Sequence, residues 1–263
     1  MSREIAWAAV TQAPQVALST VSGRTDPWSR WAEAVVTLAL GDYRGAFDAL
    51  HPLCERDDEV GGLACARIAS GLRQIDEHEA AVDWDERAIA AGGRATNDGL
   101  VGRAADAVGM SDPDLAASYL GAGRERAVDL RDEIRVAWVA EEICLLKGQY
   151  PLALAHGERA HRLSLALGSP RHIVKSALFA SAAGRASGAA GTVALLGVAF
   201  SRAQALALRP MLWPIVTVLA DDATPTQRVA AGQAVRYIHD HLPPGFGSAW
   251  TGRSDIGTLR HTA

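Results

Sequence analysis

The chain has 263 residues, of which 49% are hydrophobic and 21% are charged, and its formal net charge is −4. This charge balance argues against a strongly basic nucleic-acid-binding protein, and no apolar stretch approaches the ~18 residues of a membrane-spanning helix. The three cysteines, Cys54, Cys65 and Cys144, share no CxxC spacing and are interpreted as small buried residues in a reducing compartment. Because the N-terminus also lacks a signal-peptide pattern, we expect a cytoplasmic protein without direct nucleic-acid or membrane contacts.

Residues 1–26 are predicted to form an irregular or helical lead-in that packs on the first repeat. Pro14 would interrupt any continuous helix here, because proline lacks the backbone N–H that a helix interior uses. Asp26-Pro27 has the pattern of an N-cap followed by proline at the first helical position. The first regular helix is therefore expected to begin at residue 27.

Residues 27–222 carry an internal repeat. Four alanines, Ala46, Ala81, Ala117 and Ala153, are separated by 35, 36 and 36 residues, a period typical of stacked helix-turn-helix units. Two of them are followed seven residues later by another alanine, and two helical turns put each such pair on one helix face. Alternating strand patterns are absent. The sequence therefore predicts an all-α fold in which small residues let neighbouring helices approach closely.

The turns before these alanines carry a family resemblance. Gly41-Asp42-Tyr43 precedes Ala46, and Gly148-Gln149-Tyr150 precedes Ala153. The chain resembles the tetratricopeptide repeat (TPR) family over roughly residues 28–206, and its alanine and arginine usage is similar to that of helical-repeat proteins from GC-rich actinobacteria. The resemblance implies a TPR-like α-solenoid of about five helix-turn-helix repeats, whose first helices line a concave face. The family's closing proline is not in its usual place, so a related α-solenoid class stays open.

The C-terminal part is predicted to end the solenoid. Two prolines within residues 203–219 predict two short helical pieces or one kinked helix. Thr224-Pro225-Thr226-Gln227 has the pattern of a capping box, which predicts a capping helix within residues 223–242. Residues 243–263 show no periodic element and are expected to form a loosely ordered tail, in which Trp250 is a candidate docking residue.

The candidate site is a set of polar and basic residues at helical spacing on the first helix of each predicted repeat. Its members are Arg67, Ser70, Arg73, Gln74, Arg103, Asp106, Arg135, Trp138, Glu142, Arg171, His172 and Lys175. On a concave face they would suit a carboxylate, a phosphate or an acidic peptide. The alternative is that these residues are only the solvated face of amphipathic helices, with Trp138 packed under Ala153.

The sequence offers no pattern for metal binding or catalysis. His156 and His161 are five residues apart, and His239 and His241 two apart, whereas a helical zinc site needs histidines four apart. Acidic runs such as Glu141-Glu142 have the spacing of a solvated helix surface. Motifs of nucleophilic catalysis and phosphate-binding loops are missing, so we expect no enzyme activity, no metal and no cofactor.

These observations lead to two main functional hypotheses. The first is a non-enzymatic adaptor that binds an acidic peptide or helix of a partner protein in a concave basic groove. The alternative is a regulatory or sensor module that binds a small anionic ligand and acts on the transcription machinery through a partner protein. An enzyme on an α/α scaffold and a self-assembling structural protein, for example a homodimer, are the remaining options.

Overall fold

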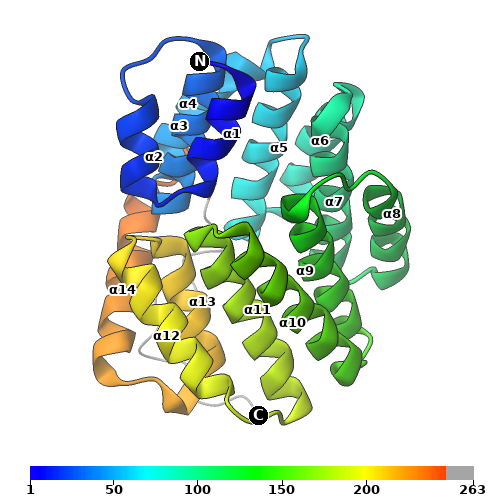
Figure 1. Ribbon diagram of the computed structural model, residues 1–263, viewed down its shortest axis with the longest axis vertical. Helices are drawn as coiled ribbons and strands as arrows, with labels where there is room; N and C mark the ends of the chain where they lie inside the picture. The colour runs from blue at the N-terminus through cyan, green and yellow to red at the C-terminus, as the bar shows by residue number, and fades with distance from the viewer. Residues whose placement is uncertain (247–263) are drawn as a thin grey trace.

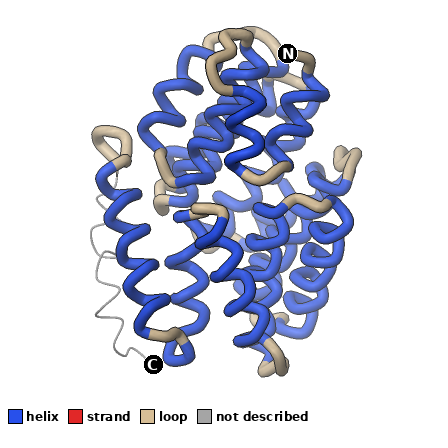
Figure 2. The backbone as a smooth tube through the Cα atoms, turned by 60° about the vertical axis from the view of Figure 1, so that its left-hand side comes forward, coloured by secondary structure: helices blue, strands red, loops and turns tan. Residues whose placement is uncertain are grey.

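The computed structural model describes residues 1–246, and it confirms the predicted all-α solenoid (Figure 1). Within these residues there are fourteen α-helices, one short 3-10 turn and no strand (Figure 2). The helices are α1 (Arg3–Thr11), α2 (Pro14–Val21), α3 (Pro27–Leu40), α4 (Tyr43–Cys54), α5 (Glu59–Gln74), α6 (His78–Ala90), α7 (Gly93–Gly109), α8 (Pro113–Glu125), α9 (Leu130–Leu146), α10 (Tyr150–Leu167), α11 (Pro170–Ser187), α12 (Thr192–Ala205), α13 (Arg209–Leu219) and α14 (Pro225–Asp240). The 3-10 turn η1 spans Ala220–Asp222.

Local capping explains where several helices begin. The carboxylate of Asp26 accepts a hydrogen bond from the backbone N–H of Ser29 at 3.0 Å, and Pro27 starts α3 as predicted. At α14 the capping box is complete: the N–H of Thr224 donates to Oε1 of Gln227 at 2.8 Å, and the N–H of Gln227 donates to Oγ1 of Thr224 at 3.2 Å. Both contacts satisfy N–H groups that would lack a partner at a helix start.

Successive helices pair as hairpins and form two layers. The hairpins are α3–α4, α5–α6, α7–α8, α9–α10, α11–α12 and α13–α14. The first helices of these hairpins pack side by side in the order α3, α5, α7, α9, α11 and α13, and α13 also contacts α3. The inner helices therefore close into a ring, which goes beyond the open solenoid predicted from the sequence.

Hydrogen bonds between the two ends of the repeat array hold the ring closed. The backbone N–H of Arg44 donates to the carbonyl oxygen of His241 at 2.7 Å, and its Nε donates to the carbonyl oxygen of Leu242 at 3.1 Å. From the other side, Nη1 of Arg209 donates to the carbonyl oxygen of Leu40 at 2.9 Å. The last hairpin is thus attached to the first by groups that are far apart in the sequence.

Gly41 makes this close approach possible. It ends α3 with φ at 96°, a left-handed conformation that glycine adopts without strain. A methyl group at this position would lie 3.1 Å from Cγ1 of Ile238 in α14. The same residue therefore terminates α3 and leaves room for the last helix.

The N-terminal helices cover one end of the ring. Both α1 and α2 pack on α3, and α1 also touches α11. The ring of Trp7 in α1 lies 4.9 Å from that of Trp31 in α3, measured between centroids. The guanidinium groups of Arg94 and Arg131 lie 4.5 and 4.8 Å from the ring centroid of Trp7. Because these arginines are the second residues of α7 and α9, α1 lies over the N-terminal ends of the inner helices.

The marker alanines occupy one structural position, except in the third repeat. Ala46, Ala81 and Ala153 are each the fourth residue of their helix and have no exposed surface. In α8 the fourth residue is Ala116, which is fully buried, whereas Ala117 is exposed. The prediction that Ala117 occupies this position was therefore wrong by one residue. Asp112 caps α8, so this helix begins at Pro113 and its fourth residue is Ala116.

Within residues 1–246, no helix combines the length and apolar character needed to cross a membrane. The three cysteines are buried and form no disulfide bond. Trp250 and most of the predicted tail lie outside the described residues.

The alanine register generates a matched pair of substitutions. We expect Ala116→Leu to lower the free energy of unfolding by about 1–3 kcal/mol, because a larger side chain overpacks the helix interface. Ala117→Leu, the control on the neighbouring exposed position, should change this energy by no more than about 0.5 kcal/mol. Urea denaturation measures both values, and equal effects of the two variants would contradict the assigned register.

Candidate functional site

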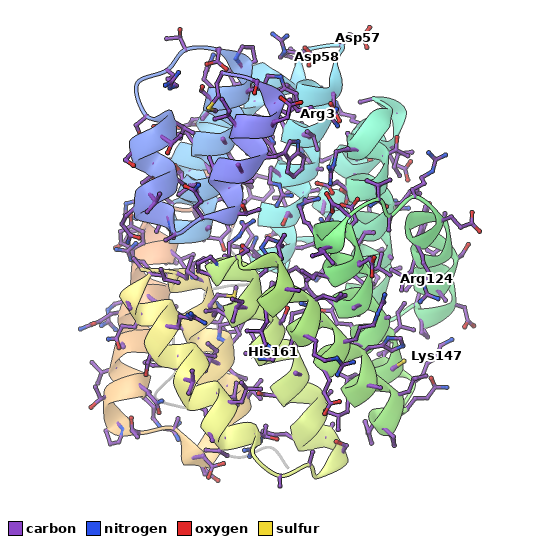
Figure 3. The ribbon with its side chains drawn as sticks, viewed as in Figure 1. Arg3, Asp57, Asp58, Arg124, Lys147 and His161 are labelled. Atoms are coloured by element: carbon purple, nitrogen blue, oxygen red, sulfur yellow. The ribbon has the colours of Figure 1, made fainter. Side chains whose placement is uncertain are left out.

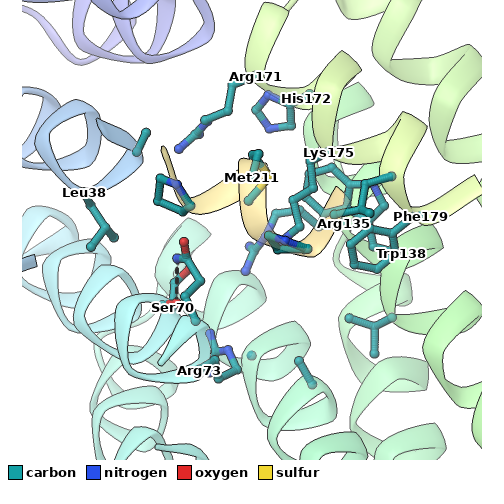
Figure 4. A pocket seen from close by; sticks show the side chains of 18 of the residues that line it. Leu38, Ser70, Arg73, Arg135, Trp138, Arg171, His172, Lys175, Phe179 and Met211 are labelled. Carbon is teal, nitrogen blue, oxygen red and sulfur yellow. Dashed lines mark hydrogen bonds between the residues drawn. The ribbon is translucent and has the colours of Figure 1, made fainter. Parts of the chain in front are cut away.

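The inner ring encloses a cavity of about 370 Å³ (Figure 4). Its walls come from α3, α5, α7, α9, α11 and α13, six helices that are spread over most of the chain. The structure brings ten of the predicted site residues together on its wall, namely Arg67, Ser70, Arg73, Gln74, Arg135, Trp138, Glu142, Arg171, His172 and Lys175. These residues therefore face an enclosed space, whereas outer-layer charges such as Arg124 and Lys147 are exposed (Figure 3).

The other two predicted residues, Arg103 and Asp106, do not line the cavity. Nε of Arg103 donates to Oε1 of Glu86 at 2.6 Å, and its guanidinium lies 4.7 Å from the ring centroid of Tyr119. Arg103 thus points toward the outer layer, since one residue along a helix turns a side chain by about 100° from the cavity-facing Gly102. Asp106 is fully buried and accepts a hydrogen bond from Arg73, which lines the cavity.

A buried carboxylate holds three of the arginines. Asp98 of α7, which is 1% exposed, accepts hydrogen bonds from Nη1 and Nη2 of Arg131 at 2.9 and 2.8 Å. It also accepts one from Nη2 of Arg67 at 3.2 Å and a shorter one from Nη1 of Arg135. Burial alone would raise the pKa of Asp98, but the charges of Arg131 and Arg135 outweigh it and hold this pKa below its usual range.

A second buried cluster surrounds Arg73 of α5. Its Nη1 donates to Oδ1 of Asp106 at 3.1 Å and also to Oδ2 of Asp85, and both aspartates are fully buried. Burial raises the pKa of Asp85 to about 8, with a further contribution from the neighbouring charge of Asp106 and an opposing one from Arg73. Burial therefore opposes the charged form of Asp85 even though its carboxylate is paired with Arg73.

Two cations on α11 have no such partner. Within the described residues, neither Arg171 nor Lys175 has a carboxylate oxygen within 4 Å. Nζ of Lys175 lies 4.5 Å from the ring centroid of Trp138 and 5.4 Å from that of Phe179. Burial lowers the pKa of Lys175 to about 8, although the charge of Glu142 opposes this shift. Burial also lowers the pKa of Arg171 to about 10, and the charge of Arg131 adds to that effect.

Glu142 is the one carboxylate among the residues that line the cavity. Burial raises its pKa, and Lys175, His78 and Arg73 oppose this shift only in part. The cavity wall and its supports thus contain six cationic groups, which are Arg67, Arg73, Arg131, Arg135, Arg171 and Lys175. Five carboxylates lie among them (Asp85, Asp98, Asp106, Asp132 and Glu142), so the fully ionised site has a surplus of one positive charge.

Trp138 and His172 connect α9 with α11. The indole Nε1 of Trp138 donates to Oγ of Ser176 at 2.9 Å, and its ring stacks on that of His172 with a centroid distance of 5.6 Å. Nδ1 of His172 lies 2.7 Å from Oγ of Ser169, which therefore binds the imidazole and does not cap α11. Burial and the charge of Arg171 hold the pKa of His172 well below its usual value, so the imidazole is neutral.

Some site residues were missed by the sequence reasoning. Arg131 lies four residues before Arg135, so the same helical spacing would have identified it. His78 begins α6 next to the cavity. The wall formed by α13 and the end of α3 has no signal in the repeat pattern, because it arises only when the ring closes.

Glu141 does not line the cavity as Glu142 does, and it is not on the solvated helix surface that was predicted for both glutamates. It is fully buried between α9 and α10, and neither of its carboxyl oxygens has a hydrogen-bond partner among the described residues. The side chain lies over Gly157, whose missing Cβ would also be 2.7 Å from Cα of Ala180. Burial, together with the charge of Glu142, raises the pKa of Glu141 to about 9. The two glutamates therefore do not form a catalytic pair aimed at one site.

The chain matches no protein-family model, and no curated protein has significant sequence similarity to it. Among residues 1–246, no group of three or more His, Cys, Asp and Glu side chains has an arrangement suited to a metal ion. The geometry and charge of the cavity are therefore the features that bear on function.

The three-arginine cluster predicts a large effect of its central carboxylate. We expect Asp98→Asn to lower the free energy of unfolding by about 3–5 kcal/mol, because it leaves the buried guanidinium groups of Arg67 and Arg135 without an ion-pair partner and Arg131 with Asp132 alone. Asp83→Asn on the exposed side of α6 is the control, with an expected change of no more than about 0.5 kcal/mol. Chemical denaturation provides the comparison, and similar stability of the two variants would contradict the role of Asp98.

The position of Glu141 predicts a pH-dependent stability. The pKa of Glu141 is raised in the folded state, so this residue favours folding at low pH. As the pH rises from the ordinary pKa of a glutamate toward 9, the free energy of unfolding should fall by up to about 1.4 kcal/mol per pH unit. Glu141→Gln should therefore be more stable than the wild type at pH 8–9 but not at pH 5. Urea titrations across this range measure the difference, with the exposed Glu125→Gln as control. A constant stability difference at all pH values would refute the prediction.

Proposed function

We propose that the protein is a non-enzymatic sensor domain that binds a small anionic ligand in the cavity of the helical ring. The observation that carries this proposal is the pair Arg171 and Lys175, which face the cavity without a carboxylate partner among the described residues. Uncompensated charge in a poorly hydrated site is unfavourable, and such charge is typical of sites that receive a ligand of opposite sign.

A further donor supports the same ligand. Arg67 is 8% exposed and lines the cavity, and its Nε has no hydrogen-bond partner in residues 1–246. A carboxylate or phosphate would accept charge-assisted hydrogen bonds from guanidinium groups of this kind, each worth about 1.5–3 kcal/mol. The ligand would thus satisfy donors that the protein itself leaves open.

The size of the site favours a small ligand over a helix. A cavity of about 370 Å³ is within the range of small-molecule pockets, which is roughly 300–1,000 Å³. The helix α13, which packs between α11 and α3, contributes Met211 and Pro214 to the wall, so it occupies the concave side of the array. A helix with side chains, which is about 10 Å wide, needs that space.

An acidic segment of a partner protein is the other occupant suggested by the sequence and by the resemblance to TPR proteins. A single acidic side chain that enters the cavity would meet the same cations. Peptide binding is therefore an outcome of the same experiment, in which poly-Glu peptides are compared with small carboxylates. A regulatory output through a partner protein remains part of the proposal.

Binding of small anions tests the proposed function. We expect carboxylates or phosphate monoesters from a defined panel to raise the melting temperature, since a ligand at 100 times its Kd adds about 2.7 kcal/mol. Arg171→Gln and Lys175→Met should each weaken binding at least about tenfold, which corresponds to about 1.4 kcal/mol. Within residues 1–246 neither side chain forms an ion pair, so both variants should fold.

Arg162→Gln is the matched control, because Arg162 is 69% exposed on α10 and lies outside the cavity. Thermal-shift screening followed by isothermal titration calorimetry measures both the stabilisation and the Kd. The proposal is overturned if no anion of the panel binds, or if Arg162→Gln weakens binding as much as the cavity variants do.

A further inference from the structure

The two sides of the cavity differ in chemistry. The cations come from α5, α9 and α11, whereas α3, α13 and the residue before α13 contribute mainly apolar side chains, among them Leu38, Leu208, Pro210 and Met211. Figure 4 shows Leu38 on the opposite side of the cavity from Trp138 and Phe179. A ligand that fills this space therefore meets charge on one side and hydrocarbon on the other.

We infer that the ligand is an amphipathic organic carboxylate, with its anionic group at Arg135, Arg171 and Lys175 and an aromatic or branched apolar body against α3 and α13. This inference rests on the proposed function and narrows its ligand class. Water in the cavity would have few hydrogen-bond partners along the α3–α13 wall, so an apolar group replaces it favourably.

The aromatic and sulfur-containing side chains favour a planar body. Phe179 and Met211 are half-buried and line the cavity, so part of their surface is open to a ligand. Aromatic rings pack well against other rings and against the polarisable sulfur of methionine. Trp138 itself contributes less, because it is only 8% exposed and its ring already stacks on His172.

The charge balance favours a singly charged head group. The surplus is small, and Glu142 faces the same cavity with Lys175 as a neighbouring charge. A second or third negative charge on the ligand would exceed this surplus and would meet the apolar wall or the carboxylate of Glu142. A monocarboxylate thus fits better than inorganic phosphate or a tricarboxylate.

The test compares five probes on the full-length wild-type protein by calorimetry: indole-3-acetate, phenylacetate, acetate, inorganic phosphate and neutral indole. We expect indole-3-acetate or phenylacetate to bind at least tenfold more tightly than acetate, phosphate and indole. If acetate or phosphate binds as tightly as the aromatic acids, the inference is overturned while the proposed anion site remains. If indole binds as tightly as indole-3-acetate, or if no probe binds, the proposed function fails as well.

Two variants locate the apolar body. Met211→Gln keeps the side-chain length but adds a polar amide, and it should reduce the preference for indole-3-acetate over acetate at least fivefold. Met110→Gln, at an exposed methionine with 41% of its surface accessible, is the control and should leave the preference unchanged. An unchanged preference in a folded Met211→Gln protein contradicts contact with α13. The wild-type probe series decides the ligand class even if this variant does not fold.

Discussion

The contact between the first and the last hairpin closes the ring and thereby determines which side chains are buried around the cavity. Carbonyl groups at the C-terminal ends of α3 and α14 lack helical partners, and arginine side chains from the facing segment supply the missing donors. Arg209 binds the carbonyl of Leu40, and Arg44 binds those of residues 240 and 242. These bonds convert an array that would expose a concave groove into a ring, so that α13 becomes a wall of the cavity.

Closure of the ring explains why the arginines need buried carboxylates. In an open groove, Arg67, Arg131 and Arg135 would be hydrated, whereas in the ring they are largely removed from water. Buried charges are tolerated only when they are paired, and Asp98 and the Asp85–Asp106 pair provide this compensation. The compensation is incomplete on α11. The protein thus gives up some stability at this position, which is a feature expected of functional sites and not of a purely structural core.

Local signals predicted the repeat units well, and non-local contacts explain the remainder. Caps at Asp26 and Thr224 set the helix starts, and the fourth residue of α4, α6, α8 and α10 is a buried alanine. The spacing of three and four residues on single helices identified most of the polar and charged residues that line the cavity. Neither Asp98 as the partner of three arginines nor the α13 wall was predictable, because both depend on contacts between different repeats or between the two ends of the array.

Electrostatic repulsion within the cavity links ligand binding to the stability of the ring. The charges of Arg131 and Arg135 lower the pKa of Arg171 after burial has already lowered it, and Arg171 has the same effect on Lys175. Arg131 also lies against Trp7 of α1, which packs over the N-terminal ends of the inner helices. An anion among these groups would reduce their mutual repulsion and strengthen the association of α5, α9 and α11. Occupancy of the cavity would thereby stabilise both the closed ring and the position of α1.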